Sequence, residues 1–375
     1  MNSLAVNLGD VTKIKTGKLD ANASSEDGEY PFFTCAQKPL RISSYSYDCE
    51  CVLIAGNGDL NVKYYEGKFD AYQRTYIVEV LPEKRSKLHL RYAYHFLETY
   101  LDTLREQSIG GIIKYIKMGN LTDAQIPLPP LAEQKRIAAI LDAADALRTK
   151  RREALAQLDA LLQSSFLTLF GDPVTNPMGW KKCCLGDLFV VIKNGANVVQ
   201  VEADSGEWAV SRIETIWNGT IDSDRVKWTT ADPSLLATHR LQSGDILFSH
   251  INSPDHIAKT AIYMGEPEIL IHGINLLRMC VDRNFVDPIW MTQFLKTPTT
   301  RSHFRTRCKK AVNQASLNQT DIKTFDAYLP PLPLQQKFAA IVESIERQKA
   351  TQRAHLAELD ALFAALQHRA FRVEL

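Results

Sequence analysis

The stretch PPLAEQKRIAAI at residues 129–140 decides the fold, because it returns as PPLPLQQKFAAI at residues 330–341. The second copy starts 201 residues after the first, and the register holds without a gap to Phe170 and its counterpart Phe371. Roughly fifteen of the positions in this segment are identical, well above chance for one fixed register. The repeat indicates that the chain contains two copies of one structural plan.

Weaker similarities precede each copy. Leu8–Val11 (LGDV) resembles Leu185–Leu188 (LGDL), and short helical patterns at Tyr94–Leu97 and Trp290–Leu295 come before the two proline pairs. Each half is therefore expected to be a variable globular part followed by a related long helix.

The two long helices follow from the spacing of apolar residues. From Leu131 to Leu169 these residues recur three and four positions apart, after a proline pair that suits a helix start. Phe170-Gly171-Asp172-Pro173 supplies a glycine and a proline that end the first helix. Each helix should have about 38 residues and measure about 57 Å at 1.5 Å per residue.

The apolar stripes of these helices need a partner, and the simplest arrangement pairs them as an antiparallel coiled coil. Arg151 and Gln352 interrupt the stripes at matching positions and are expected to set the register. The residues predicted to pack in the coiled coil or to dock partners are Ile137, Ile140, Leu141, Leu147, Leu158, Leu161, Phe338, Ile341, Ile345, Leu359 and Leu362.

The globular halves are predicted to be β-rich. Short strand-like runs bounded by Gly, Asn, Asp or Pro are Cys51–Ala55, Thr75–Val80, Ile246–Ser249 and Ile269–His272. Because no long alternation of helix and strand is present, the fold class is α+β rather than a doubly wound sheet. The predicted plan has a first globular domain at 1–130, a spacer helix at 131–172, a second globular domain at 173–329 and a second spacer helix at 330–375.

Composition excludes several classes of protein. The net charge of +1 means that any affinity for nucleic acid must come from local patches. No apolar run approaches the roughly 20 residues of a membrane span, and the N-terminus lacks a signal-peptide pattern, so a cytoplasmic, soluble protein is expected. The seven cysteines lack the spacing of a zinc site, and no metal is predicted.

No catalytic centre is predicted. The sequence has no phosphate-binding loop, no Gly-x-Ser-x-Gly motif and no Asn/Asp-Pro-Pro-Tyr motif of adenine methylation. Gly56–Asp59 is interpreted as a turn between strands, since Asn-Gly favours turns. His250, Asp255 and His256 lie close in sequence, but such a group is more often loop polarity than a metal site.

The strongest binding signal is the segment 301–310, which holds five Arg or Lys residues and no acidic residue. Arg and Lys neutralise phosphates, and Asn and Gln can pair with adenine edges. The alternative is a solvated helix face. The candidate DNA-binding residues are Asn57, Lys63, Tyr64, Gln73, Arg74, Lys114, Lys117, His250, Asn252, Arg301, Arg305, Arg307, Lys309, Lys310, Asn313 and Gln314.

Two variable domains alternating with two related helices resemble the specificity subunits of type I restriction–modification systems. The resemblance rests on the helix starts at 127–137 and 330–337, on Phe170–Pro173 and on the two Leu-Gly-Asp openings; the second copy departs from it at Leu334-Gln335. It implies a non-catalytic subunit that reads a bipartite site in double-stranded DNA. Its helices would dock two adenine methyltransferase subunits, which hold S-adenosylmethionine, and through these a motor–nuclease subunit.

Three alternatives stay open. The chain could serve a fused methylase–nuclease that cuts on both sides of its site, as in type IIB systems. It could be a coiled-coil scaffold that does not bind DNA. It could also be an enzyme with an unrecognised site, which binding of S-adenosylmethionine by the isolated chain would indicate.

Overall fold

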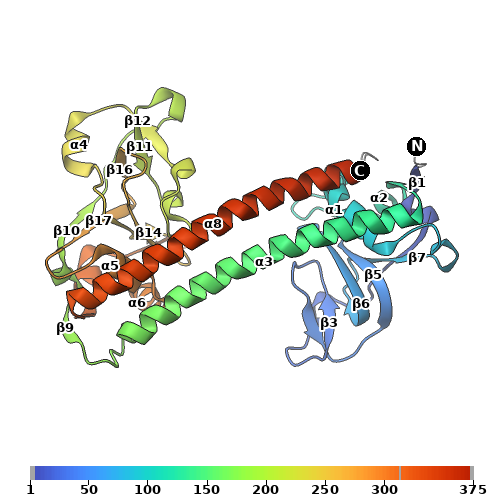
Figure 1. The fold of residues 1–375 in the computed structure, drawn as a ribbon, viewed down its shortest axis with the longest axis horizontal. Helices are drawn as coiled ribbons and strands as arrows, with labels where there is room; N and C mark the ends of the chain where they lie inside the picture. Colours follow the sequence, from blue (N-terminus) through green and yellow to red (C-terminus); the bar gives the residue numbers. More distant parts are fainter. Residues whose placement is uncertain (1–4, 312–313, 372–375) are drawn as a thin grey trace. The chain divides into compact units, whose positions relative to one another are not determined.

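The computed structural model describes residues 5–311 and 314–371, without the side chains of Lys310 and Ala311. The chain divides into two compact units (Figure 1): unit 1 comprises Met1–Glu153 with Gln352–Leu375, and unit 2 comprises Ala154–Thr351. The two predicted long helices are present as α3 (Leu131–Phe170) and α8 (Leu332–Phe371). Each helix contributes one half to each unit. The sequence had instead predicted that each whole helix forms a spacer segment of its own, at 131–172 and 330–375.

Unit 1 is built on a six-stranded sheet. Its strands lie in the order β2 (Thr12–Thr16), β7 (Thr75–Val80), β5 (Tyr47–Ala55), β6 (Val62–Ala71), β3 (Tyr30–Phe33) and β4 (Leu40–Ile42). Only β3 and β6 pair in parallel. The predicted strands at Cys51–Ala55 and Thr75–Val80 are confirmed.

Both faces of this sheet are covered, which explains the unbroken apolar run in β5. Val52 and Ile54 face α1 (Leu90–Gln107), while Cys51 and Leu53 face a second cluster with Phe33. Successive strand residues point to opposite faces, so a strand buried on both sides has no polar alternation. The short helix α2 (Met118–Thr122) and the strand pair β1 (Ala5–Asn7) and β8 (Gln125–Pro127) complete the unit.

Unit 2 has smaller sheets. A four-stranded sheet has the order β10 (Phe189–Asn194), β17 (Leu276–Val281), β13 (Ile246–Ser249) and β15 (Thr260–Ile262). Two three-stranded sheets and one pair follow: β12 (Lys227–Thr229), β11 (Trp208–Ser211) and β16 (Leu270–His272); β14 (Ile251–Asn252), β19 (Gln314–Ser316) and β18 (Lys309–Ala311); β20 (Asp326–Leu329) and β9 (Lys181–Cys184). The strands predicted at Ile246–Ser249 and near Ile269–His272 are confirmed.

The helices of unit 2 begin where the local sequence directs. α5 (Pro288–Lys296) starts on a proline, and the Asp287 side chain accepts hydrogen bonds from the backbone N–H groups of Ile289 and Trp290. α6 (Pro298–Arg307) follows after Thr297, which caps it. The remaining short helices are α4 (Pro233–His239) and α7 (Gln319–Lys323). None of the helices in the described residues is apolar over a stretch that could span a bilayer.

The glutamine of the repeated helix start makes the same contacts in both units. The fully buried Gln134 accepts a hydrogen bond from the backbone N–H of His89 and donates to the carbonyls of Lys87 and Pro129. Gln335 is equally buried. It accepts from the N–H of Asp287 and donates to the carbonyls of Phe285 and Pro330. Each glutamine thus fixes the start of a long helix to the start of α1 or α5, which confirms that the sequence repeat is a structural repeat.

In unit 1 the halves of α3 and α8 pack against each other. The Arg151 side chain donates a hydrogen bond to the Gln352 amide oxygen at 2.9 Å, as the matching interruptions of the stripes predicted. Arg148 forms ion pairs with Asp145 at 2.8 Å and with Asp360 of the other helix at 2.6 Å. The two helices are therefore antiparallel neighbours here.

In unit 2 the remaining halves repeat this network. Lys349, which stands 201 residues after Arg148, forms ion pairs with Glu346 at 2.7 Å and with Asp159 at 2.8 Å. These partners correspond to Asp145 and Asp360 in the repeat. These networks favour one register of the two helices. If either helix shifted along the other, Arg148 or Lys349, which are largely buried, would lose a carboxylate partner.

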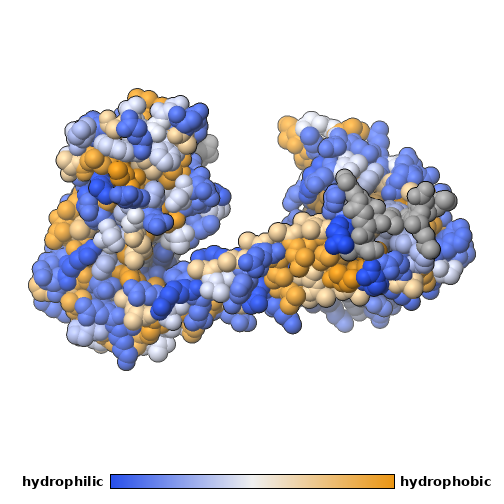
Figure 2. Space-filling model, turned by 45° about the horizontal axis from the view of Figure 1, so that its top comes forward, coloured by the Kyte–Doolittle hydropathy of each residue, from blue (hydrophilic) through white to orange (hydrophobic). Residues whose placement is uncertain are grey.

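Three of the predicted packing residues are not in the coiled coil. Leu147, Leu161 and Leu362 are each about half exposed (49%, 49% and 51%), so the prediction that they pack between the helices is wrong. Ile137, Leu141, Phe338 and Ile345 are buried as predicted. The other predicted positions are half-buried: Ile140, Leu158, Ile341 and Leu359. Figure 2 accordingly shows hydrophobic residues at the surface of the long helices.

Candidate nucleic-acid interface

A cluster of cations in unit 2 gathers residues from two segments. Arg301 and Arg305 lie on successive turns of α6, and Lys259 follows the loop after β14. Arg305 donates a hydrogen bond to the backbone carbonyl of Asp255. Lys259 lies 4.0 Å from the centre of the Trp217 ring and donates to its backbone carbonyl at 2.9 Å. We call Lys259, Arg301 and Arg305 the cationic cluster.

The charges of the cationic cluster are not neutralised by the protein. Within the described residues, none of the three cations forms an ion pair with a carboxylate. Burial and the neighbouring arginines lower the pKa of Lys259, and burial together with Arg305 lowers the pKa of Arg301. Such mutual repulsion is relieved when an anion such as a phosphate binds.

An aromatic surface borders the cationic cluster. Trp217 is 44% exposed and packs edge-on against His256 at 5.1 Å between ring centres. Burial and Lys259 lower the pKa of His256, so this ring is neutral at physiological pH. Exposed indole beside clustered cations offers a stacking surface next to a phosphate-binding surface.

His250 and Asn252 hold the neighbouring loop rather than project from it. His250 is only 7% exposed, burial lowers its pKa, and its carbonyl accepts from the N–H of Leu317. The Asn252 side chain donates to the Ser249 hydroxyl and accepts from the N–H of Ser253. A neutral, enclosed histidine is a poor phosphate ligand, so the structure places His250 behind the surface, whereas Asn252 is half-buried with its amide bonded within the loop.

The hairpin after α6 carries the other predicted residues of unit 2. Arg307, Lys309 and Gln314 are exposed, and β18 pairs with β19 so that Lys309 faces Ser316 across the ladder. The backbone of Lys310 belongs to β18, its side chain is not described, and Asn313 lies outside the described residues. β14 pairs with β19 and joins this hairpin to the loop of His250 and Asn252.

Unit 1 brings together a corresponding set of loops. Asn57 forms a β-bridge with Tyr115, and the N–H of Gly58 donates to the carbonyl of Lys114 at 3.0 Å. The exposed Arg74 places its guanidinium 5.7 Å from the centre of the Tyr115 ring. Asn57, Arg74 and Lys114 therefore lie around one hairpin, Ile109–Tyr115. Gly56–Asp59 is a turn between β5 and β6, as predicted.

The remaining candidates of unit 1 have partners within the protein. Lys63 donates to Asn61, and Gln73 donates to Asp20 at 2.8 Å. Lys117 is exposed, and its backbone N–H donates to the Asn120 side chain at the start of α2. Tyr64 donates to Glu50 at 2.6 Å and packs under Arg91 near α1, away from the hairpin.

The hairpins of the two units are equivalent. Ile109–Tyr115 corresponds to residues 310–316 at the offset of 201, and each hairpin precedes a short helix, α2 or α7. Each also pairs with the loop after a central strand, at Asn57 in unit 1 and at β14 in unit 2. The two units thus present the same kind of surface with different side chains, which suits two readers of different sequences.

Sequence reasoning did not single out Trp217. Its local signal is an aromatic residue directly before Asn218-Gly219, a pair of residues that favours a turn, with Gly219 at φ +75°. No three His, Cys, Asp or Glu side chains in the described part of the chain group closely enough to hold a metal ion.

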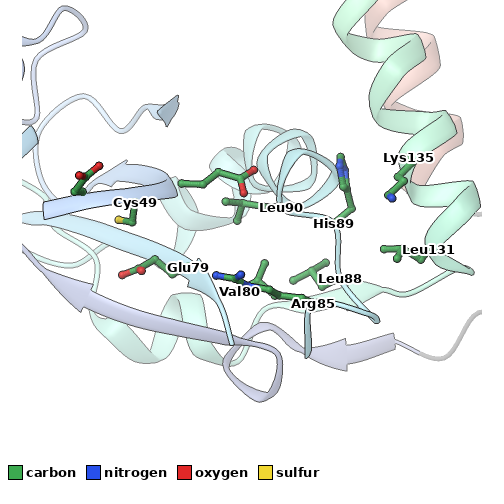
Figure 3. Close-up of a pocket in the computed structure, with 11 residues that line it drawn as sticks. Cys49, Glu79, Val80, Arg85, Leu88, His89, Leu90, Leu131 and Lys135 are labelled. Atoms are coloured by element: carbon green, nitrogen blue, oxygen red, sulfur yellow. The ribbon is translucent and has the colours of Figure 1, made fainter. Parts of the chain in front are cut away.

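A separate pocket of about 440 Å³ lies in unit 1 (Figure 3). Its walls come from the first residues of β5, from β7, from the start of α1 and from Leu131 and Lys135 of α3. Acidic Asp48, Glu50 and Glu79 stand with basic Arg85 and Lys135, so the lining has one more acidic than basic side chain. Because the pocket lies at the opposite end of β5 from Asn57, it is not part of the hairpin surface.

Comparison with known proteins gives consistent matches. Residues 4–157 and 177–361 both match the family model described as "Type I restriction modification DNA specificity domain", which confirms the predicted tandem repeat. The EcoDI type I restriction enzyme specificity subunit of Escherichia coli is 42% identical over 158 residues, which cover 42% of this chain and 34% of that protein. The EcoKI specificity subunit of E. coli K12 is 25% identical over 304 residues, which cover 75% of this chain and 64% of that protein.

Both alignments span less than two thirds of the relative's own length. Among solved structures, the S subunit of a type I restriction–modification system from M. genitalium has the same fold. It matches with a TM-score of 0.60 and 16% identity, over 98% of this chain and 95% of that one.

Proposed function

The chain belongs to the family defined by the type I restriction modification DNA specificity domain, and we propose that it is the DNA-reading subunit of such a system, with no catalytic centre of its own. Each unit would read one half of a bipartite site in double-stranded DNA. The observation that carries this proposal is the duplicated hairpin-and-loop surface, one copy in each unit, with the unpaired cationic cluster beside it in unit 2.

Affinity for DNA and specificity for its sequence come from different contacts. Unpaired cations supply attraction to phosphates that is independent of sequence, whereas side chains that reach base edges supply discrimination. Two equivalent surfaces with different side chains can each recognise a different short sequence, and a covalent link between them makes the two contacts act together.

We assign the chemistry to partner subunits in the cytoplasm. Two adenine methyltransferase subunits, which would hold the S-adenosylmethionine, and a motor–nuclease subunit would complete the complex. The exposed Leu147, Leu161 and Leu362 support docking on the long helices, because a protein partner that covers exposed apolar side chains removes their surface from water.

The decisive experiment is long-read mapping of methylated adenines in a host that expresses this chain with its methyltransferase. Exchanging residues 173–328 for those of a relative should change one half of the methylated site and leave the other half unchanged. A change in both halves would contradict separate readers. If no bipartite site is methylated and the complex does not shift DNA in a gel, the scaffold alternative would replace this proposal.

A further inference from the structure

The hairpin of unit 1 ends in an exposed apolar tip, Gly110–Ile113. Ile112 has 104% of its reference surface exposed, the largest fraction among the large hydrophobic side chains that the structure describes, and Ile113 is 62% exposed. Full exposure of isoleucine costs solvation free energy that even partial burial would recover. Such a side chain contributes nothing to the folding of unit 1.

The base of the hairpin is nevertheless firmly held. Ile109 and Tyr115 exchange two backbone hydrogen bonds of 3.0 and 2.8 Å, and Ile116 donates to the carbonyl of Gly56 at 2.9 Å. Gly110 has φ +118°, and a Cβ there would lie 2.6 Å from the carbonyl oxygen of Ile113. The sequence therefore specifies the conformation of the tip and then leaves its isoleucines uncovered.

The groups around the tip favour a polyanion as the partner. Lys114 and Lys117 are exposed, and Arg74 lies on the ring of Tyr115 at the foot of the hairpin. In the same unit, Asp59 accepts a hydrogen bond from Gln37, and Asp20 accepts one from Gln73. An apolar tip surrounded by cations matches the chemistry of side chains that wedge between base pairs while cations hold the flanking phosphates.

We propose that Ile112 enters between two base pairs of the half-site bound by unit 1 and unstacks them. This inference rests on the proposed function and adds to it a mode of reading by DNA deformability. Unstacking one step costs free energy, which burial of the isoleucine and closer phosphate contacts offset. At the same offset the second copy has Asn313 in place of Ile112, a position outside the described residues, so the wedge acts on one half-site only.

The test uses the full chain in its methyltransferase complex and duplexes that carry the mapped target. Single adenines, other than the methylated ones, are replaced by 2-aminopurine, which fluoresces when it is unstacked. Emission should rise severalfold at one step in the half-site of unit 1 and not in the other half-site. Ile112→Ser should abolish the rise and weaken binding about tenfold, whereas Ile112→Leu should preserve both.

The controls separate this inference from the proposal beneath it. Because Ile112 is fully exposed among the residues that the structure describes, Ile112→Ser should keep the wild-type melting temperature. Binding by the wild-type complex without any rise in emission, or an unchanged rise in Ile112→Ser, would overturn the wedge and leave the recognition role intact. Failure of the Ile112→Ser chain to assemble with the methyltransferase subunits in the absence of DNA would overturn the wedge and assign the tip to a protein partner instead. Failure of the wild-type complex to bind the duplex would overturn both.

Discussion

At the scale of single residues, the cationic cluster has a measurable signature. Replacing Arg301 and Arg305 by alanine removes two cations that have no carboxylate partner in the described structure. The slope of log affinity against log salt should fall by about 1.8, at about 0.9 per phosphate contact, and binding should weaken alike for all DNA sequences. Fluorescence anisotropy over a range of salt concentrations measures both quantities.

A matched control removes the same charge elsewhere in unit 2. Lys337 and Arg347 are exposed on α8, and their double replacement by alanine should leave the salt slope unchanged. Replacing Arg301 and Arg305 by lysine should also preserve most of the slope, because the charge is kept. An equal loss of slope in the Lys337 and Arg347 variant would show that net charge, rather than the cationic cluster, sets the affinity.

At the scale of elements, the hydrogen bond between Arg151 and Gln352 lies where equivalent positions of the repeat face each other. Exchanging the two residues, as Arg151→Gln with Gln352→Arg, should rebuild the same pair. The free energy of unfolding should therefore change little in the double variant, whereas Arg151→Leu should lower it by about 1 kcal/mol. Urea denaturation compares them, and a double variant as unstable as the single one would refute the symmetric pairing.

The sequence predicted the long helices well because the repeat and the apolar spacing gave the same answer. It failed at Leu147 and Leu362 for a physical reason: the inward positions belong to Arg148 and Phe363, whose guanidinium and ring lie 4.2 Å apart. Counting apolar residues assumes that arginine faces solvent, but its long side chain can pack on an aromatic ring and still reach a carboxylate.

The candidate site was less accessible to sequence reasoning. The charge run at 301–310 identified Arg301 and Arg305, because five cations without an acid are a local signal. Trp217 lies 84 positions before Arg301, and only tertiary structure brings it to Lys259. His250 and Asn252 were chosen for their hydrogen-bonding side chains, yet His250 is buried and the Asn252 amide bonds Ser249 and Ser253 of its own loop, which depends on geometry that composition does not encode.

At the scale of the whole molecule, α3 and α8 are continuous helices whose halves belong to different units. The number of residues in each helix therefore sets the length of the connection between the two proposed DNA-reading units. Four residues inserted after Lys150, with four more at the matching position after Thr351, would add about 6 Å to each helix. Since one base pair rises about 3.4 Å, the unspecified gap between the methylated half-sites should grow by about two base pairs.

The matched insertion keeps both charge networks intact, and four residues inserted beside Met178, in the loop after α3, should leave the gap as it was. Methylome sequencing reads the gap directly, and an unchanged gap in a folded, methylating double-insertion variant would show that the helices do not set the spacing.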